Sequence, residues 1–391
     1  DVAVTGQLVT TGADASTVTV QATEGNVTLT KSGSADEVIK SAKDVSISAS
    51  DSGAADENVG DILVKGNITG ATSVAISTDQ GDITLGTNDA PTAVKAGTNL
   101  GVSTTKAGDV TVNGSLTTVS TNNSTVGDVT VTATEGKVTL TKAGDATNVI
   151  DSGKDIVVTA INVVDPSNSK DEGDIDINSS LNAAGAVTVH AYKLDGTASG
   201  TGDITLDGAV TAGTAVDIAA NTGNVTIGGT TASKVQAGTT LAVKTLTDGD
   251  VAVTGQLVTT GADASTVTVS AKDGNVTLTK DGNVTMTKDG SADEVIKSAK
   301  DVSISASDSG AADENVGDIL VKGNITGATS VAISTDQGDI TLGTNDAPTA
   351  VKAGTNLGVS TTKAGDVTVN GSLTTVSTNN STVGDVTVTA N

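Results

Sequence analysis

The stretch Gly108-Asp-Val-Thr-Val-Asn113 shows the pattern on which the architecture depends: a Gly-Asp pair, then strictly alternating apolar and polar residues. The same pattern appears in Gly81-Asp-Ile-Thr-Leu-Gly86, and Gly-Asp or Gly-Asn pairs precede similar runs along most of the chain. Alternation with period 2 indicates short strands with one apolar face, and the branched Cβ atoms of Val, Ile and Thr favour the extended conformation. No apolar spacing of three and four residues runs far enough to indicate a helix.

Longer repeats enclose these strands. Residues 34–133 recur at 291–390, and residues 1–20 recur at 250–269. A more diverged copy begins at Gly136-Lys-Val-Thr-Leu-Thr-Lys142, which matches Gly25-Asn-Val-Thr-Leu-Thr-Lys31. We interpret the chain as one continuous solenoid with three super-repeats, at 25–135, 136–273 and 274–391, preceded by residues 1–24 as the tail of an earlier repeat.

Short strands separated by Gly, Asp and Asn turns predict an all-β fold, a parallel β-helix (β-solenoid) in which each coil lays its strands on the coil below. Dividing 391 residues by about 20 per coil gives roughly 18 to 19 coils. The narrow interior of such a fold suits Val, Ile, Leu and Ala, and the chain contains no Phe and no Trp. The competing all-β interpretation is a row of tandem β-sandwich domains.

Composition also excludes several classes of function. The 21 basic residues, all Lys, face 46 Asp and Glu, for a net charge of −25, which argues against nucleic-acid binding. No apolar run approaches the roughly 18 residues of a membrane span. Cys is absent, which leaves neither disulfides nor thiolate metal ligands.

The repeated Gly-Asp/Asn-Val/Ile-Thr-Leu/Val pattern, seen in 25–30, 81–85, 136–141 and 223–227, resembles the repeats of filamentous haemagglutinin and related large bacterial surface exoproteins. The resemblance implies a right-handed parallel β-helix. It also implies an extracellular, cell-surface location and a role as an extended adhesin or matrix fibre, with a host or cell-surface ligand as one partner.

Acidic loops are the sharpest local feature. Asp51-Ser-Gly-Ala-Ala-Asp-Glu-Asn-Val-Gly-Asp61 recurs at 308–318, and the middle super-repeat has an acidic loop over 165–174. Clustered carboxylates suit Ca²⁺, which takes six to eight oxygen ligands, although the spacing fits no EF-hand and the alternative is a solvated loop. The candidate metal ligands are Asp51, Asp56, Glu57, Asp61, Asp165, Asp171, Glu172, Asp174, Asp308, Asp313, Glu314 and Asp318.

Nothing in the sequence predicts an enzyme, and we assign no catalytic or cofactor-binding residue; Ca²⁺ is the one cofactor considered. His190 and Tyr192 lie in Val187-Thr-Val-His-Ala-Tyr192, where alternation turns Val inward and predicts an exposed polar strand face for the two rings. No nucleophile motif surrounds His190 or the serines.

Both ends of the chain fall within the repeat pattern and show no polar capping segment, and an uncapped coil is an open strand edge. We therefore expect a structural or adhesive rod whose ends stack head to tail with further copies of itself into a filament. The alternatives are a segment of a long, non-polymerising surface adhesin, and an ice-binding solenoid that presents rows of Thr such as Thr28 and Thr30.

Overall fold

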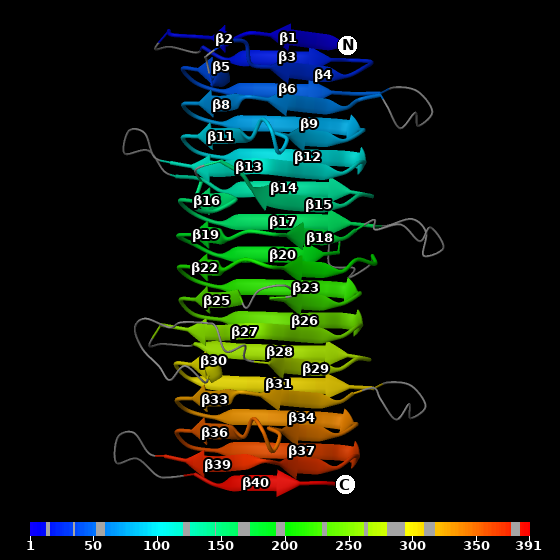
Figure 1. Cartoon of the computed structure of the whole chain (residues 1–391), viewed down its shortest axis with the longest axis vertical. Helices are drawn as coiled ribbons and strands as arrows, with labels where there is room; N and C mark the ends of the chain where they lie inside the picture. Colours follow the sequence, from blue (N-terminus) through cyan, green and yellow to red (C-terminus); the bar gives the residue numbers. More distant parts are fainter. Residues whose placement is uncertain are drawn as a thin grey trace. The chain divides into compact units, whose positions relative to one another are not determined.

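The computed structural model describes residues 1–12, 16–33, 36–51, 59–119, 126–144, 146–162, 173–192, 200–228, 233–261, 265–279, 294–308, 317–376 and 384–391. Strands dominate these residues, and none of them lies in a helix (Figure 1). Accordingly, the described part of the chain has no helix long and apolar enough to cross a membrane.

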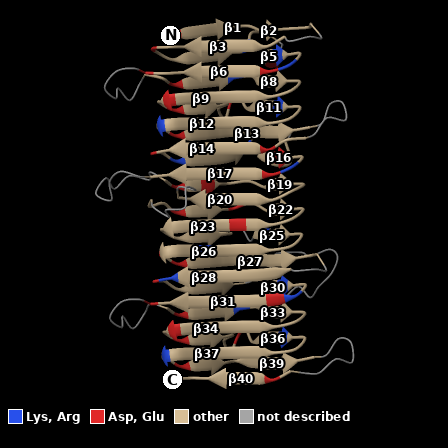
Figure 2. Ribbon diagram, turned by 180° about the vertical axis from the view of Figure 1, so that it is seen from behind, with Lys and Arg blue, Asp and Glu red and all other residues tan. Residues whose placement is uncertain are grey.

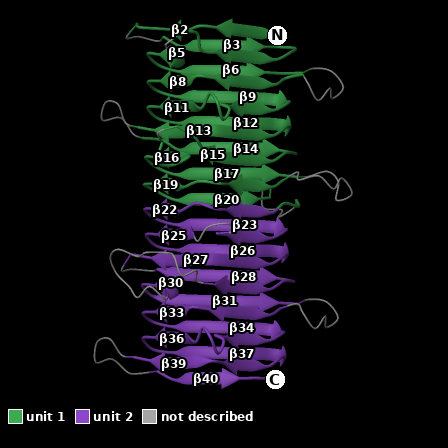
Figure 3. Ribbon diagram, in the orientation of Figure 1, with its two compact units in different colours: residues 1–202 green, residues 203–391 purple. Residues whose placement is uncertain are grey.

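The chain divides into two compact units, Asp1–Gly202 and Asp203–Asn391 (Figure 3). In each unit a coil consists of three strand segments, which follow one another around the coil. In the first unit the first segments are β1 (Val2–Thr5), β4 (Val27–Thr30), β7 (Ile62–Lys65), β10 (Ile83–Leu85), the first half of β13 (Val110–Thr118), β15 (Val138–Lys142) and β18 (Ile175–Ile177). The second segments are β2 (Leu8–Val9), β5 (Glu37–Ser41), β8 (Asn67–Gly70), β11 (Thr92–Ala96), the second half of β13, β16 (Ile150–Ser152) and β19 (Leu181–Ala183). The third segments are β3 (Val18–Ala22), β6 (Val45–Ala49), β9 (Val74–Gln80), β12 (Leu100–Ala107), β14 (Val129–Thr134), β17 (Ile156–Ile161) and β20 (Val187–Ala191).

The second unit follows the same plan. Its first segments are β21 (Ile204–Leu206), β24 (Val225–Ile227), the first half of β27 (Val251–Thr259), β29 (Val276–Thr279), β32 (Ile319–Lys322), β35 (Ile340–Leu342) and β38 (Val367–Val369). Its second segments are β22 (Val210–Ala212), β25 (Ser233–Ala237), the second half of β27, β30 (Glu294–Ser298), β33 (Asn324–Gly327), β36 (Thr349–Ala353) and β39 (Gly371–Thr375). Its third segments are β23 (Val216–Thr222), β26 (Leu241–Asp248), β28 (Thr266–Lys272), β31 (Asp301–Ser307), β34 (Val331–Gln337), β37 (Leu357–Ala364) and β40 (Val386–Thr389).

Neighbouring coils pair in parallel, and like residues lie on like residues. Val110 of β13 pairs with Ile83 of β10 on one side and with Val138 of β15 on the other. All strand pairings recorded for the described residues of both units are parallel, apart from isolated bridges. This confirms the all-β parallel solenoid and contradicts the tandem-sandwich alternative, since sandwiches are built from antiparallel sheets.

The coils are fewer and longer than the sequence predicted. The described strands form seven coils in each unit, 14 in all, so the expectation of 18 to 19 coils of about 20 residues was wrong. Ile62 pairs with Ile83, a step of 21 residues, but Val276 pairs with Ile319, a step of 43. Three strand segments and their corners already need about 21 residues, and many coils carry further residues between strands. The right-handed winding and the continuity of the solenoid through the three super-repeats stay predictions.

The core is a column of aliphatic side chains inside the coils. Alternate residues of each strand point inward, so that Val110, Val112 and Leu116 of β13 are fully buried, whereas the intervening Thr111 and Ser115 face outward. Val, Ile, Leu and Ala supply the whole apolar core of the described residues, as the composition predicted. Close stacking of like residues replaces the large aromatic anchors of an ordinary globular core.

Candidate functional site

The Gly-Asp/Asn pattern marks one corner of the coil, where the glycines of successive coils lie directly on one another. Gly108 has φ +137°, and a Cβ atom there would overlap the carbonyl oxygen of Gly81. The same overlap would arise at Gly136 with Gly108 and at Gly249 with Gly223. The glycines are therefore required by backbone stacking at this corner.

The residue after each of these glycines forms what we call the corner ladder. Its side-chain Oδ1 accepts a hydrogen bond from the backbone N–H of the equivalent residue one coil further on. In the first unit the accepting residues are Asn26, Asp61, Asp82 and Asp109, together with Asp1 at the equivalent position of the first coil. In the second unit they are Asp203, Asn224, Asp250, Asn275, Asp318 and Asp339, and the donor–acceptor distances are 2.6–2.9 Å. Asp and Asn alternate freely because both offer the acceptor oxygen that the ladder needs.

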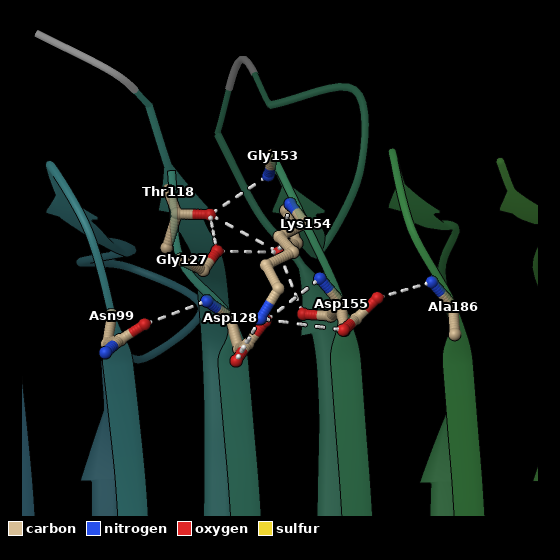
Figure 4. Close-up of polar contacts among 9 residues, drawn as sticks. Asn99, Thr118, Gly127, Asp128, Gly153, Lys154, Asp155 and Ala186 are labelled. Carbon is tan, nitrogen blue, oxygen red and sulfur yellow. Dashed lines mark hydrogen bonds and ion pairs between the residues drawn. The ribbon is translucent and has the colours of Figure 1, made fainter. Parts of the chain in front are cut away.

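A second ladder runs before the third strand segments (Figure 4). Asn99 Oδ1 accepts from the backbone N–H of Asp128, Asp128 from that of Asp155, and Asp155 from that of Ala186, over 2.7–3.3 Å. Lys154 Nζ lies 3.1 Å from Asp128 Oδ1, and its hydrogen bond to that carboxylate raises the pKa of Lys154. Much of the acidic surplus therefore works as hydrogen-bond acceptors between coils.

The acidic loops predicted to bind Ca²⁺ end at the corner that carries the first of these ladders. Asp61 and Asp318, which close the two equivalent loops, are corner-ladder residues. Burial raises the pKa of Asp61, and the negative charge of the Asp82 carboxylate raises that pKa further. The hydrogen bond from the Asp82 backbone N–H lowers it, but by less than burial raises it. Asp174, which closes the middle loop, precedes β18 at the same corner.

Asp51 and Asp308, which open the two equivalent loops, are buried (8% and 5% exposed). The backbone N–H of Asp51 donates to Asp79 Oδ1 at 2.9 Å, and Lys106 Nζ lies 3.0 Å from Asp79 Oδ2. Burial alone would raise the pKa of Asp79, but these two partners outweigh it and lower that pKa below its ordinary value. The base of the loop is thus fixed by the coils beneath it.

The other candidate ligands lie outside the described residues: Asp56, Glu57, Asp165, Asp171, Glu172, Asp313 and Glu314. Among the residues that are described, no three acidic or histidine side chains converge into a group that would hold a metal ion. Asp51, Asp61, Asp174, Asp308 and Asp318 therefore do not gather into such a group by themselves. Calcium binding by the complete loops stays a prediction.

His190 lies where the sequence placed it on β20, but the predicted exposure was wrong, because its side chain is only 4% exposed. The Tyr192 ring stacks on it, with ring centroids 4.6 Å apart and an angle of 17° between the planes. Thr159 of β17, which pairs in register with His190, is buried as well. A side chain that points away from the coil interior is here covered by its neighbours, which alternation alone does not reveal.

Comparison with known proteins adds no assignment: the chain matches no protein family, no curated protein and no solved structure. The fold itself is consistent with a β-helix repeat protein.

Proposed function

We propose that this protein is an extracellular structural or adhesive rod of the filamentous-haemagglutinin type, whose terminal coils stack on further coils. Stacking head to tail with other copies would build a cell-surface or matrix filament. The observation that carries the proposal is that inward-facing valines are buried wherever a further coil stacks on them.

Repeated segments of identical sequence, one inside the stack and one at its end, show which side chains a neighbouring coil covers. Val386 and Val388 of β40 are 43% and 49% exposed, whereas Val129 and Val131, in the same repeated sequence, are fully buried beneath β17. At the other end Val2 and Val4 of β1 are half-buried, whereas Val251 and Val253, in the same repeated sequence, are buried. Covering each valine is worth about 1–2 kcal/mol, and the open strand edge adds unpaired N–H and C=O groups.

The coil that covers these edges comes either from another copy or from more of the same chain. Sedimentation and light scattering of the 391-residue chain separate the two, because head-to-tail stacking makes particle mass rise with concentration. If the chain stayed monomeric at high concentration, self-assembly would be eliminated, and the alternative of a non-polymerising surface adhesin would remain.

A matched pair of variants tests the surface involved. Val388→Lys places a charge on the open apolar edge and should suppress association, whereas Thr387→Lys adds the same charge at the neighbouring, outward-facing position and should leave association unchanged. Equal effects of both variants would show that general charge, and not the coil edge, controls association.

An ice-binding role is a second candidate, because outward threonines line up across coils. Thr84 pairs in register with Thr111, and Thr111 with Thr139. The row is broken by Leu63 next to Thr84, and by Ala252 and Leu320 in the second unit. The broken rows place the ice-binding role second. If the chain did not inhibit ice recrystallisation in an assay, this role would be eliminated.

A further inference from the structure

The first unit has a groove of about 570 Å³ over the outer surface of the second strand segments. Its floor is the outward face of β8, β11 and the second half of β13, with Asn67, Lys95, Ser115 and Thr117 among the lining residues. Register places Lys95 between Thr69 and Thr117, one coil to either side. Short polar side chains around Lys95 therefore form the floor, and a second lining lysine, Lys31, is paired with Asp36 at 3.2 Å.

Two loops form the walls. The coil through β13 turns its corner within one continuous strand, whereas the flanking coils carry extra residues between their first and second segments. One wall contains Pro91 and follows a tight turn, in which Thr87 and Ala90 exchange backbone hydrogen bonds of 2.9 and 3.1 Å. The other contains Gly144, where a Cβ atom would lie 3.7 Å from Pro91 Cγ. The walls thus approach each other across the shorter β13 coil.

The groove offers both hydrogen-bond donors and acceptors. Lys95 makes no ion pair with any described residue and supplies an ammonium group. Asn67 Oδ1 accepts from the Ala93 backbone N–H at 2.8 Å, which leaves the amide nitrogen of Asn67 as a donor. Asp151 Oδ1 accepts from Asn182 Nδ2 at 2.7 Å, which leaves Oδ2 as an acceptor.

We propose that this groove binds a short neutral oligosaccharide of two or three sugar units. Hydroxyl groups donate and accept at once and so match a floor of ammonium, amide, hydroxyl and carboxylate groups. The volume lies within the range of small-ligand sites. Three lining carboxylates, Asp36, Asp89 and Asp151, outnumber the two lining lysines. Together with the net charge of −25 they disfavour an anionic ligand. The site deepens the adhesive part of the proposed function and needs no end stacking.

The repeat supplies matched controls. Lys352 and Ser372 in the second unit have the same sequence surroundings as Lys95 and Ser115 but do not line this groove. Lys95→Ala removes the central cation, and Ser115→Tyr fills the floor. Lys352→Ala and Ser372→Tyr make the same changes away from the groove.

Saturation-transfer NMR with maltotriose, cellotriose and triacetylchitotriose, at protein concentrations where the chain is monomeric, tests the proposal. At least one sugar should bind the unaltered chain, with affinity about tenfold lower for Lys95→Ala, no binding to Ser115→Tyr, and unchanged binding to both controls. If none of the three sugars bound, or if the control variants lost as much affinity as the groove variants, the proposal that this groove binds a sugar would be wrong. Binding only of an anionic hyaluronan tetrasaccharide would overturn the neutral class. Because β40 is untouched, these results are independent of the association test.

Discussion

At the level of single residues, the Gly-Asp/Asn pair performs two tasks that only these residue types combine. Glycine lets two backbones meet at the corner, as at Gly81 and Gly108. The following Asp or Asn then accepts a hydrogen bond from the next coil, as Asp82 does from the Asp109 backbone. The most conspicuous motif of the sequence is therefore explained by coil stacking and needs no ligand.

Replacing one corner glycine should destabilise the fold strongly. We expect Gly108→Ala to cost about 2–3 kcal/mol or more, because the residue combines positive φ with overlap against the Gly81 carbonyl. Gly101→Ala is the control, since a Cβ atom there meets nothing within 4 Å, and its effect should be within about 1 kcal/mol. Urea unfolding of both variants measures the difference, and equal costs would contradict the stacking explanation.

The charge on Asp61 should lower stability at neutral pH. Its pKa is raised in the folded chain, chiefly by burial and further by the Asp82 carboxylate, so folding favours the protonated form. The contribution of Asp61 to the free energy of unfolding therefore falls as the pH rises from its pKa in the unfolded chain through its higher pKa in the folded chain. Asp61→Asn keeps the acceptor for Asp82 and removes the charge, so we expect a higher melting temperature at pH 7.

The gain from Asp61→Asn should shrink below the ordinary Asp pKa, where the original carboxyl is also neutral. Asp79→Asn provides the opposite case, because the pKa of Asp79 is lowered and its charge stabilises the fold above that pKa. Melting curves from pH 3 to pH 7 for both variants test the signs. A loss of stability with Asp61→Asn at pH 7 would refute the argument.

At the level of elements, the sequence was sufficient for the strands and insufficient for what lies between them. Period 2 located strands such as β10 and β13 because inward and outward positions differ sharply in polarity. The predicted number of coils was wrong because the segments between strands differ in length, and no sequence pattern marks how long each segment is. The groove also escaped prediction, because its walls come from loops about fifty residues apart, around Pro91 and Gly144, and meet only once the register is known.

The acidic loops should respond to Ca²⁺ if their ligands gather as predicted. At the first residue of two of these loops the backbone N–H is held by the neighbouring coil, as Asp51 N–H is by Asp79 Oδ1 at 2.9 Å. At 100 times the dissociation constant, one site adds about 2.7 kcal/mol. We expect melting temperature to rise in 10 mM CaCl₂ but not in NaCl of equal ionic strength. No difference between the two salts would eliminate calcium binding.

At the level of the whole molecule, the net charge of −25 is distributed along the coils. In the view of Figure 2 the charged residues gather mostly at strand ends, and much of the broad strand surface carries none. Most of the ion pairs between described residues join neighbouring coils, as Lys106 does with Asp79 and Lys137 with Asp176. The acidic surplus is thus tolerated within the fold but opposes the approach of a second copy.

Association through the coil ends should therefore strengthen with salt. Two chains of charge −25 repel each other over a Debye length of about 30 Å at 0.01 M salt but only about 3 Å at 1 M. The contact between inward-facing valines such as Val4 and Val388 is apolar and survives at both. We expect sedimentation to show larger particles at high salt, and Val388→Lys to remain small at both. If association weakened with salt, the contact would be made by ion pairs, and the stacking of open coil edges would be wrong.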